Sequence, residues 1–136
     1  MTARERFATA RVARLATMGP DGPHVVPIVF ALDGDVLYHA VDHKPKRTTA
    51  LKRLENLRAD PRASVLADAY DEDWARLWWA RADGTARILE PGHAPAIERL
   101  RERYPQYRER PPDGPVVAID VSRWSTWSAR GDDQSA

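Results

Sequence analysis

Tight-turn sequences recur through the first forty residues and are the feature that most restricts the fold. The cluster Gly-Pro-Asp-Gly at 19–22 separates two predicted strands, 11–17 and 24–32, the second of which is rich in β-branched residues. Asp33-Gly34 then leads into a third predicted strand, 36–41. Strands joined by so short a turn must pair antiparallel, because a parallel pair needs a crossover of about a dozen residues. The sequence therefore predicts three consecutive antiparallel strands.

The remaining chain alternates between strand and helix patterns. Further strands are predicted over 63–70, 77–89 with a bulge or bend at Asp83-Gly84, and 116–121; helices are predicted over 2–10, 45–58 and 94–104, and a surface loop over 105–115. Six strands in hairpin order suit a closed or nearly closed antiparallel barrel. The 136 residues suit one domain, which we place at 1–130, followed by a tail at 131–136 that we expect to be disordered.

Charge and residue inventory restrict the possible partners. The 21 basic and 20 acidic side chains nearly balance, which argues against a dedicated nucleic-acid-binding protein. The chain has no cysteine, so it forms neither disulfides nor thiolate metal sites, and this fits a reducing cytoplasm. No apolar stretch approaches the roughly 20 residues of a spanning helix. The four dispersed histidines predict no metal site, and we expect a cytoplasmic protein without a membrane partner.

The segment from Asp42 to Thr48 carries the strongest functional signal. It joins a predicted strand to a helix N-terminus, where unpaired N–H groups and the helix dipole favour an anion. Cations at that position are unfavourable for the helix itself, so their presence points to an anionic ligand. The side chains that could bind a phosphate are Lys44, Lys46, Arg47 and Thr48. The alternative is a solvated, charged helix face.

Tryptophan is frequent, with five in the chain, and two of the five are adjacent. On a strand, Trp78 and Trp79 must point to opposite faces, so one can fill the interior while the other lies outside. We expect the outward ring to lie at a subunit interface or on the wall of a cofactor cleft. Arg81 shares the face of Trp79. We expect His43 and Tyr70 near the same cleft, each with a structural or cofactor-orienting role rather than as a proton donor.

Four segments together resemble the pyridoxamine 5′-phosphate oxidase-like split-barrel family, in particular its branch that uses the deazaflavin coenzyme F420. They are RVARLATMGPDGPHVVPIVFAL at 11–32, LYHAVDHKPKRT at 37–48, LENLRADPRASVLADAY at 54–70 and DEDWARLWWARADGTARIL at 71–89. The resemblance implies a six-stranded antiparallel split β-barrel, mainly β with two to three flanking helices, of the FMN-binding type. The chain lacks the terminal substrate-binding features of a true pyridoxamine phosphate oxidase.

The resemblance also implies a homodimer with two cofactor sites at the subunit interface. In each site one copy would hold the phosphate through the segment from Asp42 to Thr48, which we call the basic junction. Strands of both copies would contact the ring. The residues expected to border the ring are Val26, Pro27 and Ile28, and those expected from the partner copy are Trp79 and Arg81. The sequence identifies no catalytic residue, which is consistent with chemistry carried by the cofactor.

The expected function is an F420-dependent oxidoreductase that transfers a hydride between reduced deazaflavin and an unsaturated or quinone-like small molecule. F420 carries an acidic glutamate tail beyond its phosphate, and Lys52, Arg53 and Arg58 extend the positive charge along the same predicted helix. Two alternatives remain open. One is an FMN-binding flavoprotein oxidase or reductase, and the other is a cofactor-binding protein without turnover.

Overall fold

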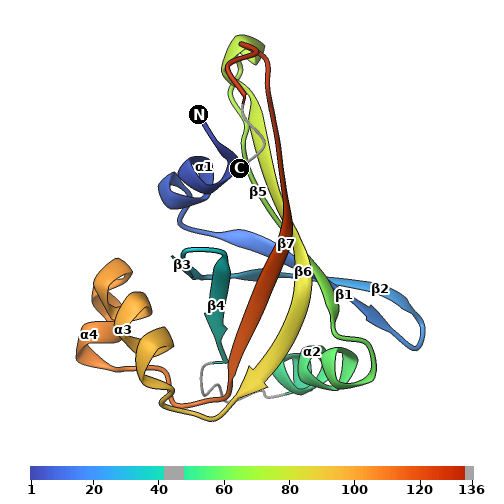
Figure 1. Cartoon of the computed structure of the whole chain (residues 1–136), viewed down its shortest axis with the longest axis vertical. Coiled ribbons are helices and arrows are strands. Elements are labelled where there is room, and N and C mark those ends of the chain that lie inside the picture. The colour runs from blue at the N-terminus through green and yellow to red at the C-terminus, as the bar shows by residue number, and fades with distance from the viewer. Residues whose placement is uncertain (42–47, 134–136) are drawn as a thin grey trace.

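The computed structural model describes residues 1–41 and 48–133, with backbone only at 48–51. Within these residues seven strands form one antiparallel sheet in the order β2-β1-β5-β6-β7-β4-β3 (Figure 1). Their bounds are β1 Ala13–Gly19, β2 Gly22–Ile28, β3 Ala31–Asp33, β4 Val36–Ala40, β5 Arg62–Ala69, β6 Trp78–Leu89 and β7 Val116–Ser128. The prediction of an antiparallel, mainly β fold is confirmed.

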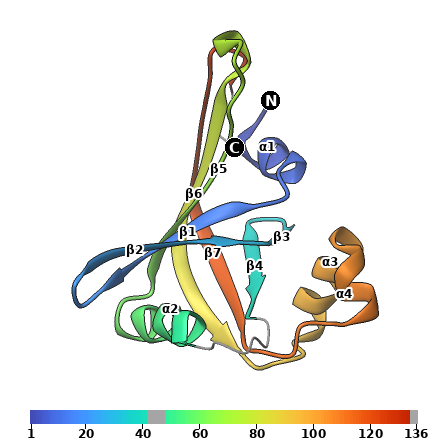
Figure 2. The same cartoon turned by 180° about the vertical axis from the view of Figure 1, so that it is seen from behind.

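Two details of the predicted barrel are wrong. The sheet has seven strands rather than six, because the segment predicted as one strand over 24–32 is divided into β2 and β3. The barrel is also not closed: among the described residues β2 and β3 are the two edges of the sheet, and no ladder joins them. Instead the sheet is strongly twisted, so that β1 and β2 cross β6 and β7 (Figures 1 and 2).

The break between β2 and β3 is caused by the buried side chain of Tyr104, which is 8% exposed. Its hydroxyl accepts a hydrogen bond from the Phe30 N–H at 3.0 Å. The same hydroxyl lies 3.0 Å from the Phe30 carbonyl and 2.9 Å from the Arg11 carbonyl, which share its single hydrogen. Because the Tyr104 hydroxyl takes up the hydrogen bonds of the Phe30 main chain, Phe30 does not pair with a neighbouring strand, and β2 ends before it.

Replacing Tyr104 by Phe should lower the free energy of unfolding by about 2 kcal/mol, because the buried N–H of Phe30 loses its acceptor. Denaturant unfolding at fixed protein concentration measures this change. Tyr70→Phe is the control, since it removes the same atom from a side chain that is 69% exposed, and it should have almost no effect. Equal stability of Tyr104→Phe and the parent protein would contradict this explanation of the break.

The helices are α1 Ala3–Thr9, α2 Thr48–Ala59, α3 Ala94–Arg103 and α4 Pro105–Glu109, with a short 3-10 turn η1 at Trp74–Arg76. Thr2 caps α1 through a reciprocal capping box with Glu5, as expected for a threonine at this position. The loop predicted over 105–115 begins instead with α4, because Pro105 occupies a first-turn position that tolerates a missing N–H. None of the helices in the described ranges is long and apolar enough to span a membrane.

Two apolar cores cover parts of opposite faces of the sheet. The main core lies between one face and helices α1 and α2, and it includes Phe7, Leu15, Phe30, Leu37, Leu54 and Val65. The second core lies between α3, α4 and the opposite face near β3 and β4, and it includes Tyr38, Ala96, Leu100, Tyr104, Tyr107 and Val116. We call the face opposite the main core the outer face.

A β-bulge between β6 and β7 allows both cores to form. Asp83 pairs with Arg123, whereas Gly84 pairs with Val121, so Ser122 is one extra residue on β7. The bulge reverses the alternation of β7, and as a result Ile119 enters the main core while Ala118 enters the second. The predicted bulge at Asp83-Gly84 is confirmed, and β7 extends well past the predicted end at 121.

The free edge of β2 is blocked by proline. Gly19 and Gly22 face each other across a two-residue turn and therefore form a hydrogen-bonded pair. Alternation from that pair directs the main-chain groups of residues 23, 25 and 27 away from β1. Pro23 and Pro27 have no N–H, so Val25 alone offers a donor along this edge of β2.

Candidate functional site

A large part of the outer face is covered by no helix of the described residues. Helices α3 and α4 cover it only near β3, β4 and the adjoining half of β7, while β2, β1, β5 and the η1 ends of β6 and β7 stay open (Figures 1 and 2). Large apolar side chains on this open part are exposed, with Val25 at 60%, Trp127 at 44% and Leu66 at 39%. An apolar surface of this kind marks a site of association or ligand binding.

A cleft of about 410 Å³ lies on the outer face where β5, β6 and β7 approach η1. Its walls are mainly aromatic and aliphatic, and they include Leu66, Tyr70, Leu77, Trp79, Arg81 and Trp127. Trp79 on β6 pairs directly with Trp127 on β7, so the two indoles are cross-strand neighbours. We call this feature the aromatic cleft.

Arg81 supplies the positive charge of the aromatic cleft. Its guanidinium carbon lies 5.8 Å from the centre of the Trp79 ring, a distance typical of a cation–π contact. Its Nε donates to Asp83 Oδ2 at 3.1 Å, and Asp83 Oδ1 in turn accepts from the Ser64 hydroxyl at 2.6 Å. The side chain is therefore held in place beside the indole while it remains partly accessible. The prediction that Trp79 and Arg81 share one outward face is confirmed.

Sequence alternation also predicted that Trp78 would point the other way, and it does. Trp78 packs partly buried against the main core, and the Arg6 guanidinium lies 5.9 Å from its ring centre. The two adjacent indoles thus point to opposite faces of the sheet, although Trp78 also contributes to the lining of the aromatic cleft.

The three residues expected to border a cofactor ring are divided between the two faces. Pro27 is on the outer face, in one cross-strand row with Arg14, Leu66 and Arg81. Val26 and Ile28 point into the main core, where they are 8% and 3% exposed. Contact between these two residues and a ligand on the outer face would have to come from main-chain atoms.

The residues predicted to bind the phosphate lie at or beyond the edge of what the structure describes. Lys44, Lys46 and Arg47 are outside the described residues, and Thr48 is described only as the first residue of α2. Their role in phosphate binding stays a prediction. A helix does follow the basic segment, as the sequence predicted, although its described part begins at Thr48 and ends at Ala59 rather than at residue 58.

The cations further along α2 differ in their surroundings. Lys52 and Arg58 are exposed, and the acidic Glu55 is exposed between them. Arg53 is half-buried, with Nη1 2.6 Å from His39 Nε2. The Nδ1 atom of His39 lies 3.2 Å from the Val29 carbonyl, which can only accept, so Nδ1 carries the hydrogen and Nε2 accepts from Arg53. Arg53 thus ties α2 to β4.

Val41 and Thr48, the described residues that flank the basic segment, lie at the opposite end of one copy from the aromatic cleft. Ala40, the last residue of β4 before the junction, pairs with Val116 at the start of β7. Trp79 pairs with Trp127, eleven residues further along the same strand. At about 3.3 Å per residue the two levels are up to about 35 Å apart along β7. Figure 1 shows the same separation, with α2 at the lower end and η1 at the upper end.

A second hollow of about 540 Å³ on the outer face lies between these ends, beside the bulge. It is lined by small and polar groups that include Thr17, Ser64, Asp83, Thr85 and Ser122. The sequence analysis identified neither the polar residues of this hollow nor Leu66 in the aromatic cleft. The alternation of apolar Ala63, Val65 and Ala67 with Ser64 and Asp68 could have placed Leu66 on the outward face of β5. Within the described residues, no three His, Asp or Glu side chains converge on a metal site.

The family model described as pyridoxamine 5′-phosphate oxidase matches residues 2–128. The chain belongs to the pyridoxamine 5′-phosphate oxidase family. The match covers nearly all the elements described above, from the cap of α1 to the end of β7. The family-level resemblance seen in the sequence is therefore confirmed.

Solved structures share the fold. A conserved hypothetical protein of Mycobacterium tuberculosis is 26% identical, with a TM-score of 0.72 over 93% of this chain and 82% of its own. An FAD-binding protein of Mesorhizobium loti is 21% identical, with a TM-score of 0.64 over 91% of this chain and 90% of its own. The heme storage protein HutZ of Vibrio cholerae is 16% identical, with a TM-score of 0.68 over 92% and 91%. This range of ligands means that the fold alone does not define the cofactor.

Proposed function

We propose that the protein is a homodimeric oxidoreductase that holds a phosphorylated flavin-type cofactor and transfers a hydride between it and an unsaturated or quinone-like small molecule. The observation that carries this proposal is the aromatic cleft, in which Trp79 and Arg81 form a cation–π pair on an uncovered sheet face. Membership of the pyridoxamine 5′-phosphate oxidase family supports the same class of chemistry.

The residues of the aromatic cleft fit a planar, electron-accepting ring. Its volume of about 410 Å³ falls within the range of small-molecule sites. Trp79 and Trp127 offer flat apolar surfaces for a tricyclic ring, and Arg81 offers a cation that would stabilise negative charge developing on the ring. A reduced cofactor bound there would supply the hydride. The chain's own groups bind and orient both reactants and exclude water.

Two copies are needed to assemble such a site. In one copy the described residues that flank the basic segment, Val41 and Thr48, lie at the other end of β7 from the aromatic cleft, so we infer that one cofactor does not reach both groups within one copy. A two-fold axis that lies across the strands, between two outer faces, would bring the η1 end of one copy to the α2 end of the other. Each site would then take its phosphate-binding residues from one copy and its aromatic wall from the partner.

Two observations bear on the choice between F420 and FMN. Lys52 and Arg58 are exposed on α2 and could meet the acidic tail of F420, which supports F420 as the cofactor. Arg53, however, is engaged by His39, and Glu55 interrupts the positive surface. The FAD-binding relative supports FMN as the second candidate.

Titrations with F420 and FMN at low and high salt should distinguish the two cofactors. We expect F420 to bind more tightly, and its affinity to fall more steeply with salt, because exposed cations are screened beyond about 10 Å at 0.1 M salt. Lys52→Gln together with Arg58→Gln should remove most of that difference in slope, whereas Arg101→Gln, an exposed cation on α3, should not. Tighter binding of FMN, or equal slopes, would assign the site to FMN.

Turnover separates an enzyme from a cofactor carrier. With menadione as the acceptor, the protein should accelerate oxidation of the bound, reduced cofactor well above the rate in buffer. The absorbance of the reduced cofactor reports this rate directly. Tight binding with no acceleration for menadione or for a conjugated enone would favour the cofactor-binding protein without turnover.

A further inference from the structure

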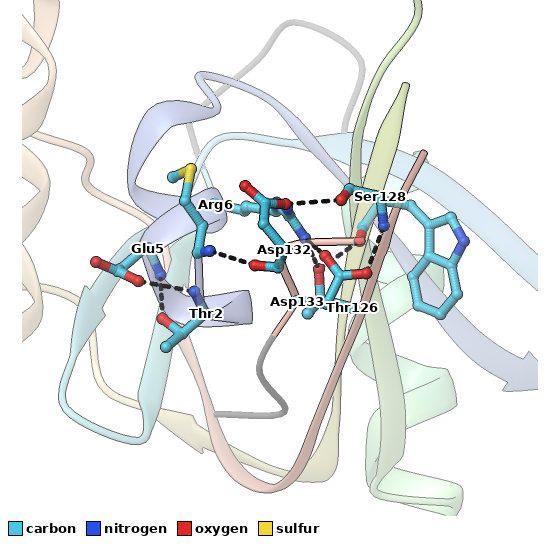
Figure 3. Close-up of polar contacts among 9 residues, drawn as sticks. Thr2, Glu5, Arg6, Thr126, Ser128, Asp132 and Asp133 are labelled. Atoms are coloured by element: carbon cyan, nitrogen blue, oxygen red, sulfur yellow. Dashed lines mark hydrogen bonds and ion pairs between the residues drawn. The ribbon is translucent and has the colours of Figure 1, made fainter. Parts of the chain in front are cut away.

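Arg6 is a buried cation on α1 that lies next to the aromatic cleft but does not line it. The residue is 2% exposed, and its guanidinium makes contacts in three directions (Figure 3). Nη2 donates to Asp132 Oδ1 at 2.9 Å, and Nη1 donates both to the Asp133 carboxylate and, at 2.6 Å, to the Thr126 hydroxyl. The charge is thus paired with two carboxylates, as a buried charge requires, while Nε makes no hydrogen bond to the described residues.

The two carboxylates come from Gly131–Asp133, just beyond β7, which we call the strap. The sequence led us to expect disorder from residue 131, whereas these three residues are described and held by hydrogen bonds. Ser128 at the end of β7 holds both: its N–H donates to Asp133 Oδ2 at 2.6 Å and its hydroxyl to Asp132 Oδ1 at 2.8 Å. The hydrogen bond from Ser128 lowers the pKa of Asp132. Burial raises the pKa of Asp133, but hydrogen bonds from Arg6 and Ser128 outweigh it, and the net shift is downward. Both side chains therefore stay ionised beside Arg6 at neutral pH.

A hydrogen-bond relay connects Arg6 to the wall of the aromatic cleft. The Thr126 hydroxyl donates to the Trp79 carbonyl at 2.8 Å, because a carbonyl can only accept. Its lone pair then accepts from Arg6 Nη1. Arg6 also faces the ring of Trp78, on the opposite side of the same strand from the Trp79 ring. Hydrogen bonds thus run from the strap to Arg6, from Arg6 to Thr126, and from Thr126 to the main chain of Trp79, which carries the cleft indole.

We propose that Arg6 is a positioning residue for the aromatic cleft, which it fixes through the Thr126 hydroxyl while the strap holds Arg6 in place. The η1 ends of β6 and β7 project beyond the crossing strands, with α1 beside them (Figures 1 and 2). Without the relay, this end of the two strands would keep its ladder but lose the contact that fixes the Trp79 main chain relative to α1. The proposal rests on the proposed function only in so far as the cleft holds a cofactor.

The experiment uses the full chain labelled with 5-fluorotryptophan, whose five fluorine resonances are assigned by single Trp→Phe variants. Thr126→Val removes the hydroxyl and keeps the shape, whereas Thr126→Ser keeps the hydroxyl. Asp132→Asn combined with Asp133→Asn weakens the strap. The matched control is Asp120→Asn, which breaks a bidentate ion pair with Arg87 on the part of β7 beyond the bulge.

In the ligand-free protein we expect the Trp79 resonance to shift or broaden in Thr126→Val and in the strap variant, and to stay in place in Thr126→Ser and Asp120→Asn. In the same two affected variants, affinity for the cofactor found by titration should fall roughly 10-fold, since small displacements of a binding wall have effects of this size. An unchanged Trp79 resonance in Thr126→Val, or an equal change in Thr126→Ser, would overturn the proposal.

The two proposals fail in different ways. If the resonances change as expected but the parent protein binds neither FMN nor F420, the proposed function is wrong and the positioning role of Arg6 stands. If the parent protein binds a cofactor and the Thr126→Val resonances match those of the parent, the positioning role is wrong and the proposed function stands.

Discussion

Two variants that each fail to bind the cofactor should bind it when they are combined in one dimer. The first variant carries Lys46→Ala and Arg47→Ala and loses two of the predicted phosphate-binding side chains. The second carries Trp79→Ala and Arg81→Ala and loses the aromatic wall. Alone, the first should lose roughly 2–5 kcal/mol of binding free energy, because each charge-assisted bond contributes about 1.5–3 kcal/mol and the effects overlap. We expect a comparable loss for the second, because it removes both the ring surface and the cation.

In the mixed dimer one site combines the intact junction of one copy with the intact cleft of the other, and the second site is doubly defective. Coexpression with two different affinity tags yields this mixed dimer, and titration should give one cofactor per dimer at the parent affinity. Sedimentation should show about twice the chain mass of 15.4 kDa. A monomer that binds cofactor at micromolar concentration would contradict the shared site.

The reciprocal pairing is the matched control. A dimer of one parent copy and one copy carrying all four substitutions has no intact site if the two groups act between copies, and one intact site if they act within a copy. Binding by this dimer, together with no binding by the mixed dimer of the two double variants, would show that each site is built within one copy.

Replacing Gly84 by Ala should lower the free energy of unfolding by about 3 kcal/mol or more, an effect at the high end for overpacking. A Cβ atom at this position would lie 2.2 Å from the Asp120 carbonyl oxygen and 2.9 Å from its carbonyl carbon. Both atoms belong to the main chain of β7, beside the bulge, so neither can rotate away. Relief requires separating β6 from β7, the strands that join the two cores.

Thermal or denaturant unfolding at matched protein concentration measures this loss, and Gly19→Ala provides the control. There the nearest atoms to a Cβ would be the side-chain amide of Asn56, at 3.2–3.3 Å, and the Gly22 carbonyl oxygen, at 3.4 Å. We expect a change within about 1 kcal/mol for the control. If the two variants unfold alike, the close approach at the bulge does not limit the fold.

Local patterns predicted most of the fold, and contacts distant in sequence decided the rest. The hairpin at 13–28, the capped helix α1 and the bulge at Gly84 follow from turn, cap and glycine signals within a few residues. The end of β2 could not be predicted in this way. It depends on the hydroxyl of Tyr104, which is 74 residues from Phe30 in sequence.

The same distinction applies to the candidate site. Period-two alternation alone separated Trp78 from Trp79 and placed Arg81 beside the latter. The pairing of Trp79 with Trp127 depends on the register of two long strands, which the bulge shifts by one residue. The ion pair of Arg6 with Asp132 spans 126 residues and leaves no local signal. These contacts required the tertiary structure.

The prolines of β2 restrict how copies of this chain can associate. An exposed sheet edge normally offers a row of N–H groups to which another strand can add, and repeated addition leads to fibrils or exchanged strands. Along β2 that row is reduced to the single donor of Val25, and the opposite edge, β3, is only three residues long. Further strands therefore find almost no template along the described edges. This is consistent with the assembly that we propose, in which side chains on the outer face would meet across a two-fold axis that closes at two copies.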